Sequence, residues 1–593
     1  MTGQTTPSAS EQLRSPDGRG RLRRPPSTAL AALGYVVVAI LVTFSAWTDP
    51  MARWIGGVGD AEQSMSFLGW FPFAVTHGLN PLHISYIDLP TGLNAMWNTT
   101  MPFAALLIWP ARALFGIVAA YNIMFVAALT LDGLCTFVWL RRRTRHQAAA
   151  FIGGLMLVVG PYALGQTYGH LNLVLFFALP LMFILLEDIV RQPTVRQLRR
   201  GFGLGVLGAV QLLCSEELLA LGAVAFVIAL AITALGARRT AVLQTAAHIA
   251  PVAIAAIIGF VVLAGGPLVY QLVGPGVLQA PPQAGDRYVT DLVNLVVPTQ
   301  TVLLSPGSLG AGHPIPSWTG GLTEWDGYIG VPLLLVFSFA MVRWRAGWFR
   351  VVGWTTVVLV VLSLGPHLHV NGASSASVPM PEILIDRLPF LTSLLPSRFG
   401  LLVDFGLAAA LATFVDRVGY RPQVHVRAMG WLAAGLVAAT FWPASVPSSV
   451  VSVPRYFEAG GDVAQIPPAT ATLLFPLPDL PSASSTTAAL WQAIPDFRFK
   501  MFSGAGISPT AAGAPGFGSP DLPLRCVTDS LQLTGSASGC STTPPEFLVG
   551  LRALGIRLII AGPTDHLREI AAYLTSLTGE QPHQDQGVLI WTV

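Results

Sequence analysis

Long apolar runs recur along most of the chain and are separated by short polar segments. Eleven of them approach the roughly 20 residues that an α-helix needs to cross the hydrocarbon core of a bilayer. In chain order they cover residues 28–48, 117–140, 149–165, 171–190, 201–214, 218–236, 248–272, 327–345, 350–367, 399–417 and 428–446. The pattern predicts a mainly α-helical, polytopic membrane bundle of about eleven spans over 28–446.

The longest of these apolar stretches, residues 201–236, is interrupted only by a Ser-Glu-Glu sequence at 215–217. One arginine pair precedes it at 199–200 and another follows at 238–239. Cytoplasmic loops carry an excess of Lys and Arg, and a helical hairpin puts both pairs on that side. We therefore expect two spans here, with the two glutamates at an outer turn.

Arginine is unevenly divided between the two ends of the predicted spans. With the N-terminus inside, the cytoplasmic segments hold 21 arginines and the outer loops hold 5. The positive-inside rule then predicts an integral plasma-membrane protein with a cytoplasmic disordered tail over 1–27. Its outer loops are 49–116, 273–326 and 368–398, and the part at 102–116 is expected to lie in the membrane interface.

Beyond residue 447 the composition shifts to Pro, Ser, Thr and Asp. The short apolar runs that indicate strands are 471–475, 556–560 and 588–593. Thr564 or Asp565 is expected to cap a helix that runs to about residue 577. A small extracytoplasmic α/β domain is predicted over 447–593. Whether Cys526 and Cys540 form a disulfide there is left open by the sequence.

Composition excludes several classes of protein. Hydrophobic residues make up 53% of the chain and charged residues 11%, against about 25% charged in an ordinary soluble domain. The mean hydropathy is +0.61. A soluble globular protein, a disordered chain, a collagen and a disulfide scaffold are therefore excluded. The net charge of +3 gives no reason to expect a nucleic-acid partner.

Ionisable and polar residues gather at the predicted outer side of the membrane. They include Asp60, Glu62 and His77 in the first outer loop, Gln166 and His170 at the next outer turn, Glu216 and Glu217 at the third, and Arg398 before the tenth span. Such groups cost about 2.5–3.5 kcal/mol each at membrane depth, so they are functional candidates. Their gathering on one side suits a reaction at the outer interface on a lipid-bound substrate.

Each candidate also has a purely structural interpretation. Asp60 could cap the helix that follows it, because Asp is a favoured N-cap residue. Glu216 and Glu217 are about 100° apart on a helix, so they cannot both face one cavity. His170 could be a hydrogen-bonded turn residue. Arg398 could anchor at the headgroups, although a guanidinium also binds phosphate well.

No metal or nucleotide motif is assigned. His367 and His369 are expected on opposite sides of a strand, so they make a weak metal pair, and a divalent cation is left open. Gly203, Gly205 and Gly208 match a dinucleotide fingerprint by letter, but they open a membrane helix, where small residues permit close helix packing. The sequence has no phosphate-binding lysine loop, zinc-ligand spacing or nucleophile elbow, which excludes ATP hydrolysis.

Four stretches give the chain a family resemblance: GDAEQ at 59–63, MWNTTMP at 96–102, GHLN at 169–172 and SEEL at 215–218. In these stretches and in its architecture the chain resembles the GT-C superfamily of integral-membrane glycosyltransferases, particularly bacterial members with a C-terminal extracytoplasmic domain. GT-C enzymes place an essential carboxylate in the first outer loop, and Asp60 is the matching position. The Trp-Trp-Asp signature of oligosaccharyltransferases is absent, so peptide N-glycosylation is not expected.

The resemblance implies transfer of a sugar from a polyprenyl-phosphate donor to a cell-envelope glycan or lipid acceptor, with inversion. Asp60 would be the general base, and Glu217 or Glu216 would orient the acceptor or the base. His170 and Arg398 would stabilise the leaving lipid phosphate. The remaining substrate-binding candidates are Glu62, Gln166, Trp97, Asn98 and His77. The C-terminal domain would hold the acceptor or cover the cleft through Trp491, Phe497, Arg498 and Phe499.

Two other classes of function compete with this one. A lipid-linked sugar flippase or transporter would be expected to show two similar halves with polar breaks near the bilayer midplane, and the sequence has no such repeat. A non-catalytic membrane protein for envelope assembly would leave the acids without a shared cavity. The decisive expectation is therefore spatial: Asp60, His170 and Glu217 should line one pocket.

Overall fold

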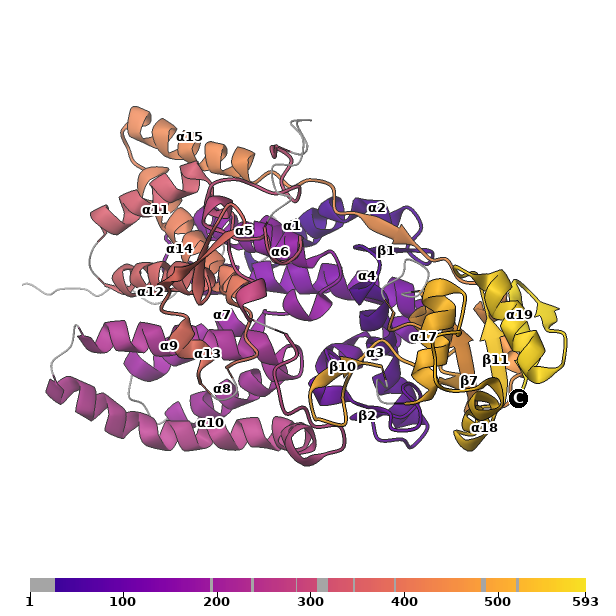
Figure 1. Cartoon of the computed structure of the whole chain (residues 1–593). Helices are drawn as coiled ribbons and strands as arrows, with labels where there is room; N and C mark the ends of the chain where they lie inside the picture. The colour runs from indigo at the N-terminus through magenta and orange to yellow at the C-terminus, as the bar shows by residue number, and fades with distance from the viewer. Residues whose placement is uncertain are drawn as a thin grey trace, which may run out of the picture.

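The computed structural model describes residues 27–191, 196–235, 239–283, 285–306, 318–344, 347–388, 391–480, 487–518 and 522–593. The tail predicted over 1–27 lies outside these residues except for Ser27. Figure 1 shows a body of long helices on one side and a smaller mixed part, containing the C-terminus, on the other.

A helix is found at every predicted span. These helices are α1 (Ser27–Val42), α4 (Pro102–Arg141), α5 (Gln147–Val159), α7 (Ala178–Arg191), α8 (Gln197–Leu212), α9 (Glu216–Leu235), α10 (Arg239–Val273), α11 (Val331–Arg343), α12 (Trp348–Ser363), α14 (Gly400–Val418) and α15 (Val424–Thr440). Within the described residues, six helical segments are long and apolar enough to cross a membrane. The mainly helical bundle is confirmed, and the count of eleven crossings stays a prediction.

One expectation about individual helices agrees with the structure. The apolar stretch at 201–236 is divided, because α8 ends at Leu212 and α9 begins at Glu216. Helix α4 is kinked at Gly116, whose φ of 81° and ψ of 173° break the helical path. The segment before this kink exposes large apolar side chains, among them Leu106 and Leu114, and its position in the membrane interface stays a prediction.

Close packing holds the helical body together. Helix α14 is surrounded by α5, α11 and α12 (Figure 1) and is buried along nearly all its length. Helices α8 and α10 approach closely at Gly205, where an added Cβ would lie 1.9 Å from the carbonyl oxygen of Ala256. The glycines of this stretch therefore serve helix packing, as predicted, since small residues let two backbones approach.

The C-terminal part is built on a five-stranded sheet in the order β12-β13-β11-β7-β8. Its strands are β7 (Thr470–Phe475), β8 (Phe499–Met501), β11 (Leu558–Ala561), β12 (His583–Asp585) and β13 (Val588–Thr592), and its helices are α16 (Ala488–Ala493), α17 (Leu524–Thr534), α18 (Pro544–Ala553) and α19 (Leu567–Thr578). Strands occur at the three predicted positions. The predicted cap of α19 was wrong, because His566 is the N-cap residue. Cys526 and Cys540 form a disulfide.

The first outer loop is joined to this C-terminal part. Strand β1 (Arg53–Ile55) pairs with β6 (Ser448–Val450), and helix α3 (Asp60–Thr76) packs on α16. Trp70 and Phe73 of α3 contact the ring of Phe497 at centroid distances of 5.7 and 5.1 Å. The far end of α3 is therefore fixed by an aromatic cluster, which fixes the position of its first residue, Asp60.

The remaining elements are short. They are α2 (Phe44–Trp47), β2 (His83–Ile84), β3 (Leu93–Asn94), α6 (Pro161–Gln166), β4 (His367–Val370), β5 (Ala373–Pro379), α13 (Ile383–Asp386), β9 (Ile507–Pro509), β10 (Pro515–Phe517) and the 3₁₀ turns η1 (Ala95–Trp97), η2 (Leu171–Leu173), η3 (Gly285–Arg287), η4 (Leu292–Leu295), η5 (Pro396–Phe399), η6 (Arg455–Phe457) and η7 (Asp462–Gln465). Several of these lie in the predicted outer loops, where the candidate residues gather.

Candidate active site

Asp60 is the first residue of α3 and projects from a glycine turn. Gly59 is the N-cap residue, with a φ of 111° that residues with a side chain rarely adopt. The backbone N–H of Gly59 donates to Glu62 Oε2 at 2.6 Å, so the cap is supplied by Glu62. The Asp60 side chain is 63% exposed. The Asp60 side chain therefore does not cap the helix and is accessible from solvent.

His170 meets Asp60 from a break between two helices. The residue lies after α6 and just before η2, and its Nε2 is 3.0 Å from Asp60 Oδ2. Gly169 makes this approach possible, because an added Cβ there would lie 3.1 Å from the Cβ of Asp60. The hydrogen bond to His170, together with the charges of His170 and Arg398, holds the pKa of Asp60 below its ordinary value against the opposing effect of burial. Asp60 is therefore a carboxylate at neutral pH.

Gln166 fixes the orientation of the His170 ring. Its Nε2 donates to the carbonyl oxygen of Thr323 at 2.6 Å and to Asp326 Oδ2 at 3.1 Å. The amide oxygen of Gln166 must then face His170, whose Nδ1 lies 2.9 Å away. An amide oxygen only accepts, so Nδ1 carries a hydrogen. The ring nitrogen that faces Asp60 is thus the one that can exchange a proton with the carboxylate.

Asp326 ends this chain of hydrogen bonds. Its side chain is buried, and its Oδ1 has no hydrogen-bond partner. Burial, with the nearby charge of Glu324, raises the pKa of Asp326 to about 8. The sequence places Glu324 and Asp326, before the eighth predicted span, among the ionisable residues of the outer side. No role was predicted for either acid.

Arg398 and Glu217 form an ion pair beside this chain. Glu217 stands in the first turn of α9, and its Oε1 also accepts the backbone N–H of Leu395 at 3.1 Å. Arg398 is carried by η5, and its Nε is buried without a hydrogen-bond partner. The positive charge of Arg398 acts on both Asp60 and Asp326. The guanidinium thus retains an N–H group that an anionic ligand could use.

Glu62 and Gln166, both predicted to bind substrate, lie beneath the site instead. The side chains of both residues are fully buried. Burial raises the pKa of Glu62 to about 7, and the charge of Asp60 contributes to this rise. Glu62 caps α3 and Gln166 orients His170. The structure therefore gives both residues positioning contacts and no access to a bound substrate.

The other candidates from the first outer loop and α9 lie elsewhere. Glu216 accepts a hydrogen bond from Gln271 at 2.8 Å, and Trp97 Nε1 donates to the carbonyl oxygen of Gln271 at 2.9 Å. Asn98 bonds the backbone of Ile507 through both its amide nitrogen and its oxygen. These contacts tie loops to one another. The two glutamates face different partners, as their separation of about 100° requires.

His77 lies at the opposite end of α3 from Asp60, where it is exposed and its Nδ1 is 2.9 Å from the carbonyl oxygen of Phe73. Seventeen residues of helix separate the two ends, which is about 25 Å at 1.5 Å per residue. The structure does not bring His77 to the site. Its predicted contact with substrate finds no support in this placement.

The C-terminal residues expected to hold the acceptor make contacts within the protein instead. Trp491, Phe497 and Phe499 are buried in the hydrophobic core. Arg498 donates to the backbone carbonyl groups of Ile466 and Ala464 at 2.7 and 2.9 Å. The expected contact of the three aromatic side chains with the acceptor was wrong, because their apolar rings are buried in the hydrophobic core beside the five-stranded sheet.

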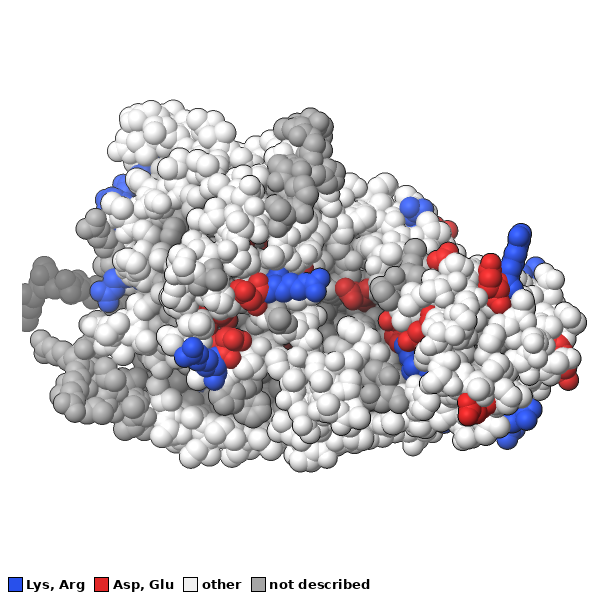
Figure 2. All heavy atoms as spheres, viewed as in Figure 1, with Lys and Arg blue, Asp and Glu red and all other residues white. Residues whose placement is uncertain are grey.

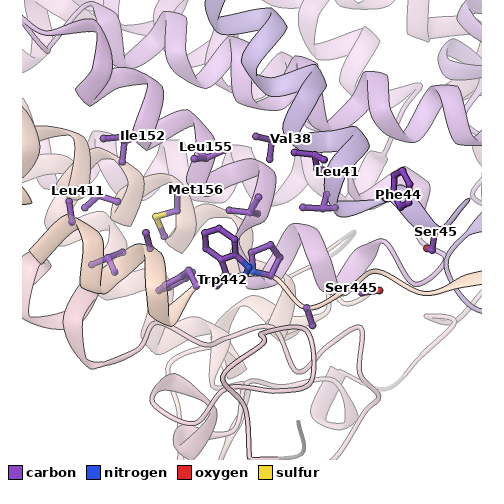
Figure 3. A pocket seen from close by; sticks show the side chains of 18 residues that line it. Val38, Leu41, Phe44, Ser45, Ile152, Leu155, Met156, Leu411, Trp442 and Ser445 are labelled. Carbon is purple, nitrogen blue, oxygen red and sulfur yellow. The ribbon is translucent and has the colours of Figure 1, made fainter. Parts of the chain in front are cut away.

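The space-filling view places this chemistry in context. In Figure 2 acidic and basic side chains lie across the middle of the face and over the C-terminal part, whereas most of the helical body shows none. A separate cavity of about 660 Å³ lies between α1, α5, α14 and α15. Its lining is mainly aliphatic and aromatic, includes Trp442, Ser45 and Ser445 (Figure 3), and includes no titratable side chain. The reactive groups therefore lie outside this apolar cavity.

A comparison with known proteins finds solved structures that have a similar fold. A sequence profile for the family described as "Domain of unknown function (DUF6311)" matches residues 31–440. No curated protein matches the chain. The arabinofuranosyltransferase AftD from mycobacteria is similar in structure, with a TM-score of 0.56, 16% identity, and coverage of 95% of this chain and 40% of its own. The structure of a variant of that enzyme gives a TM-score of 0.51 and 16% identity, and the match covers 91% of this chain and 36% of the variant.

ArnT from Cupriavidus metallidurans is also similar, with a TM-score of 0.45, 13% identity, and coverage of 95% of this chain and 98% of its own. The chain spans less than half the length of AftD. At these identities the comparison shows the fold alone. The chain shares the fold of AftD, in agreement with the resemblance, and its described residues include six helical segments that are long and apolar enough to cross a membrane.

Proposed function

The chain belongs to the DUF6311 family, and we propose that it is a membrane glycosyltransferase acting on a polyprenyl-phosphate sugar. One observation carries the proposal. A continuous hydrogen-bonded chain runs from Asp60 through His170 and Gln166 to Asp326, and the Arg398–Glu217 ion pair stands beside it. The groups come from five distant parts of the sequence. This supports the expectation of one shared reaction site.

In the proposed reaction Asp60 is the general base. Its carboxylate takes the proton of an acceptor hydroxyl while the acceptor oxygen attacks the anomeric carbon of the donor sugar. The bond between that carbon and the phosphate oxygen breaks on the opposite face, so the configuration inverts and the lipid phosphate leaves with the electron pair. A positioned base contributes about 10²–10⁴-fold to such a step. The exposed, ionised state of Asp60 supports this role.

Charge on the leaving phosphate would be stabilised by Arg398 and His170. Preorganised donors aimed at developing charge are commonly worth about 10²–10³-fold each. Glu217, which also accepts the backbone N–H of Leu395, holds the Arg398 guanidinium, whose Nε–H has no hydrogen-bond partner. His170 is held by Gln166 with one ring nitrogen directed at Asp60. Both side chains are thus fixed before the donor binds.

We further propose that the site faces outward, with the N-terminus in the cytoplasm and the C-terminal part outside the cell. The distribution of 21 against 5 arginines supports this orientation. The donor would then keep its polyprenyl tail in the bilayer and present its headgroup at the outer interface. The acceptor would be a glycan or glycolipid of the cell envelope.

The test is an assay of the purified, full-length protein in lipid nanodiscs with a panel of polyprenyl-phosphate sugars and envelope glycan acceptors. Asp60→Asn should abolish transfer, because the amide keeps the size of the side chain but cannot accept the proton. Asp49→Asn is the matched control: Asp49 is an exposed residue of the same loop that only caps a local turn. Full transfer by a folded Asp60→Asn protein would end the proposal.

A further inference from the structure

The two histidines of β4 lie against an aspartate and do not form a metal site. His367 and His369 were expected on opposite sides of a strand, and this expectation was wrong, because residues two apart in a strand share a face. Both rings lie against the same oxygen, Asp286 Oδ1, at 3.4 and 3.5 Å. Among the described residues no group of three His, Cys, Asp or Glu side chains could hold a metal ion. The feature that invites a ligand away from Asp60 is instead the apolar cavity of Figure 3.

This cavity is a slot in the outer half of four predicted spans. Its lining comes from residues 38–45 of α1 and α2, 152–159 of α5, Leu411 of α14, and 434–445 of α15 and the segment after it. Ile152 and Leu411 stand at one end of the slot, and Ser45 and Ser445 stand at the other (Figure 3). In the predicted topology α1, α5 and α15 all run outward, so the end with the two serines is the outer end.

The slot is open to the surface of the helical body. Three of its lining side chains, Leu41, Phe44 and Trp442, are 64%, 61% and 59% exposed. Leu432 and Leu436 of α15 are exposed beside them. Large apolar side chains that are exposed together mark a contact with a membrane or another apolar partner. Because these residues belong to predicted spans, the slot faces the hydrocarbon of the bilayer.

A cation stands beyond the outer end of the slot. Arg53 is carried by β1, and its Nε donates to Ser448 Oγ at 3.3 Å. Ser448 follows Ser445 by three residues, which is about 10 Å of extended chain. Asp49, the acid nearest to Arg53 in the sequence, accepts the backbone N–H of Ala52 instead. Arg53 makes no ion pair within the part of the chain that the structure describes, and a guanidinium in this state binds phosphate well.

We propose that the slot binds the acyl chains of one anionic phospholipid of the outer leaflet, with the lipid phosphate at Arg53. Dry apolar cavities take up apolar ligands, and a close-packed interior does not keep about 660 Å³ empty. The exposed indole of Trp442 is at the depth of the lipid esters, because Trp collects where hydrocarbon meets the headgroups. An apolar slot below an unpaired cation is complementary to a lipid that carries a net negative charge.

The sugar donor of the proposed function has its place elsewhere. No residue of α3, α6 or η5, the elements that carry Asp60, Gln166 and Arg398, lines the slot. Helix α14 reaches the slot at Leu411, which is eleven residues beyond Gly400 and about 16 Å along the helix at 1.5 Å per residue. The phospholipid therefore fills the space between four helices without entering the reaction site. The proposal does not depend on the proposed function.

The test is photo-crosslinking of the full-length protein with phosphatidylglycerol that carries a diazirine on one acyl chain. The probe is added as a trace to phosphatidylcholine nanodiscs, and mass spectrometry of peptides should place the label on 152–159 and 434–445. Ala438→Trp should remove this labelling, because Ala438 lines the slot from an exposed position and an indole there fills it. Ala439→Trp is the matched control, since Ala439 is an exposed neighbour that does not line the slot.

The role of the cation is tested separately. Arg53→Gln should lower labelling of the slot by about tenfold, as expected for the loss of one hydrogen bond to a charged group, while the gel-filtration profile stays that of the wild type. Arg427→Gln, at an exposed arginine near the inner end of α15, should label as the wild type does.

Three results would overturn the proposal. The first is equal labelling of the slot in the wild type and in folded Ala438→Trp. The second is displacement of the label by polyprenyl phosphate but not by unlabelled phosphatidylglycerol, which would assign the slot to the donor. The third is a dimeric wild type beside a monomeric Ala438→Trp, which would assign it to a second copy of the chain. Asp60→Asn should label as the wild type does, so a failure of this proposal is distinguishable from a failure of the glycosyltransferase assay.

Discussion

Replacement of Asp326 by asparagine should change how the stability of the protein depends on pH. Burial raises the pKa of Asp326 to about 8, against an ordinary value of 3.8. Between these two values the folded state keeps a proton that the unfolded state has released. The free energy of unfolding of the wild type therefore falls as pH rises through this window, by up to about 1.4 kcal/mol per pH unit from this one group.

Asp326→Asn removes that dependence, because the amide does not titrate and still accepts from Gln166. Near pH 4 the variant and the wild type should be equally stable as far as this group is concerned. By pH 8 the variant should be more stable, with an upper limit of about 5 kcal/mol that relaxation of the surroundings will reduce. Above the raised pKa the difference should level off.

The measurement is reversible chemical unfolding of both proteins in the same detergent at several pH values from 4.5 to 8.5. Only the difference between the two proteins is used, so other titrating groups cancel. Glu324→Gln is the control, because the charge of Glu324 contributes to raising the pKa of Asp326, and its removal should shift the window to lower pH. A difference that stays constant across the range would refute the assignment of Asp326 as a buried, protonated acid.

Three further substitutions test the site, and a fourth, Glu216→Gln, is the control for one of them. Gln166→Leu removes the acceptor for His170 Nδ1 and should lower kcat by about 10–100-fold, by analogy with the loss of residues that orient metal-bound histidines, with little change in KM for the donor. Arg398→Lys keeps the charge but loses the fork of N–H donors, and should lower kcat by about 10²-fold. Glu217→Gln should reduce both activity and melting temperature because it leaves Arg398 unpaired, whereas Glu216→Gln, which can still bond Gln271, should be nearly silent in the same assays.

The helical part of the fold was accessible from the sequence because a bilayer imposes a simple length and composition on each span. The interruption at 215–217 and the arginine pairs even located the hairpin turn between α8 and α9. What the apolar pattern could not give was the true helix ends. Helix α10 begins at Arg239, well outside its apolar window, because polar residues continue a helix wherever backbone hydrogen bonding is satisfied. Helix α4 begins at Pro102 because a further apolar segment, 102–115, is joined to it across the kink at Gly116.

Less of the candidate site could be predicted, and the reason is geometric. The residue types were found by their cost in a membrane, which identified Asp60, His170 and Arg398 as unusual. Burial determines which other polar residues can reach a substrate. Glu62 and Gln166 are polar and close to Asp60, but the side chains of both are fully buried. No feature of the sequence distinguishes a side chain that faces a cavity from one that supports it from beneath. For the same reason no role could be predicted for Asp326.

The reactive groups share a local feature that the span pattern conceals. Asp60 follows a turn with glycines at positive φ, His170 follows the end of α6, and Arg398 lies on the 3₁₀ turn before α14. None of these positions is inside a regular helix that crosses the bundle. Irregular backbone near membrane depth must find its hydrogen bonds within the protein. Here Glu62 accepts the backbone N–H of Gly59, and Glu217 accepts the backbone N–H of Leu395. The two glutamates that bond these irregular backbone segments therefore also position the reactive side chains, so stability and reactivity at this site depend on the same residues.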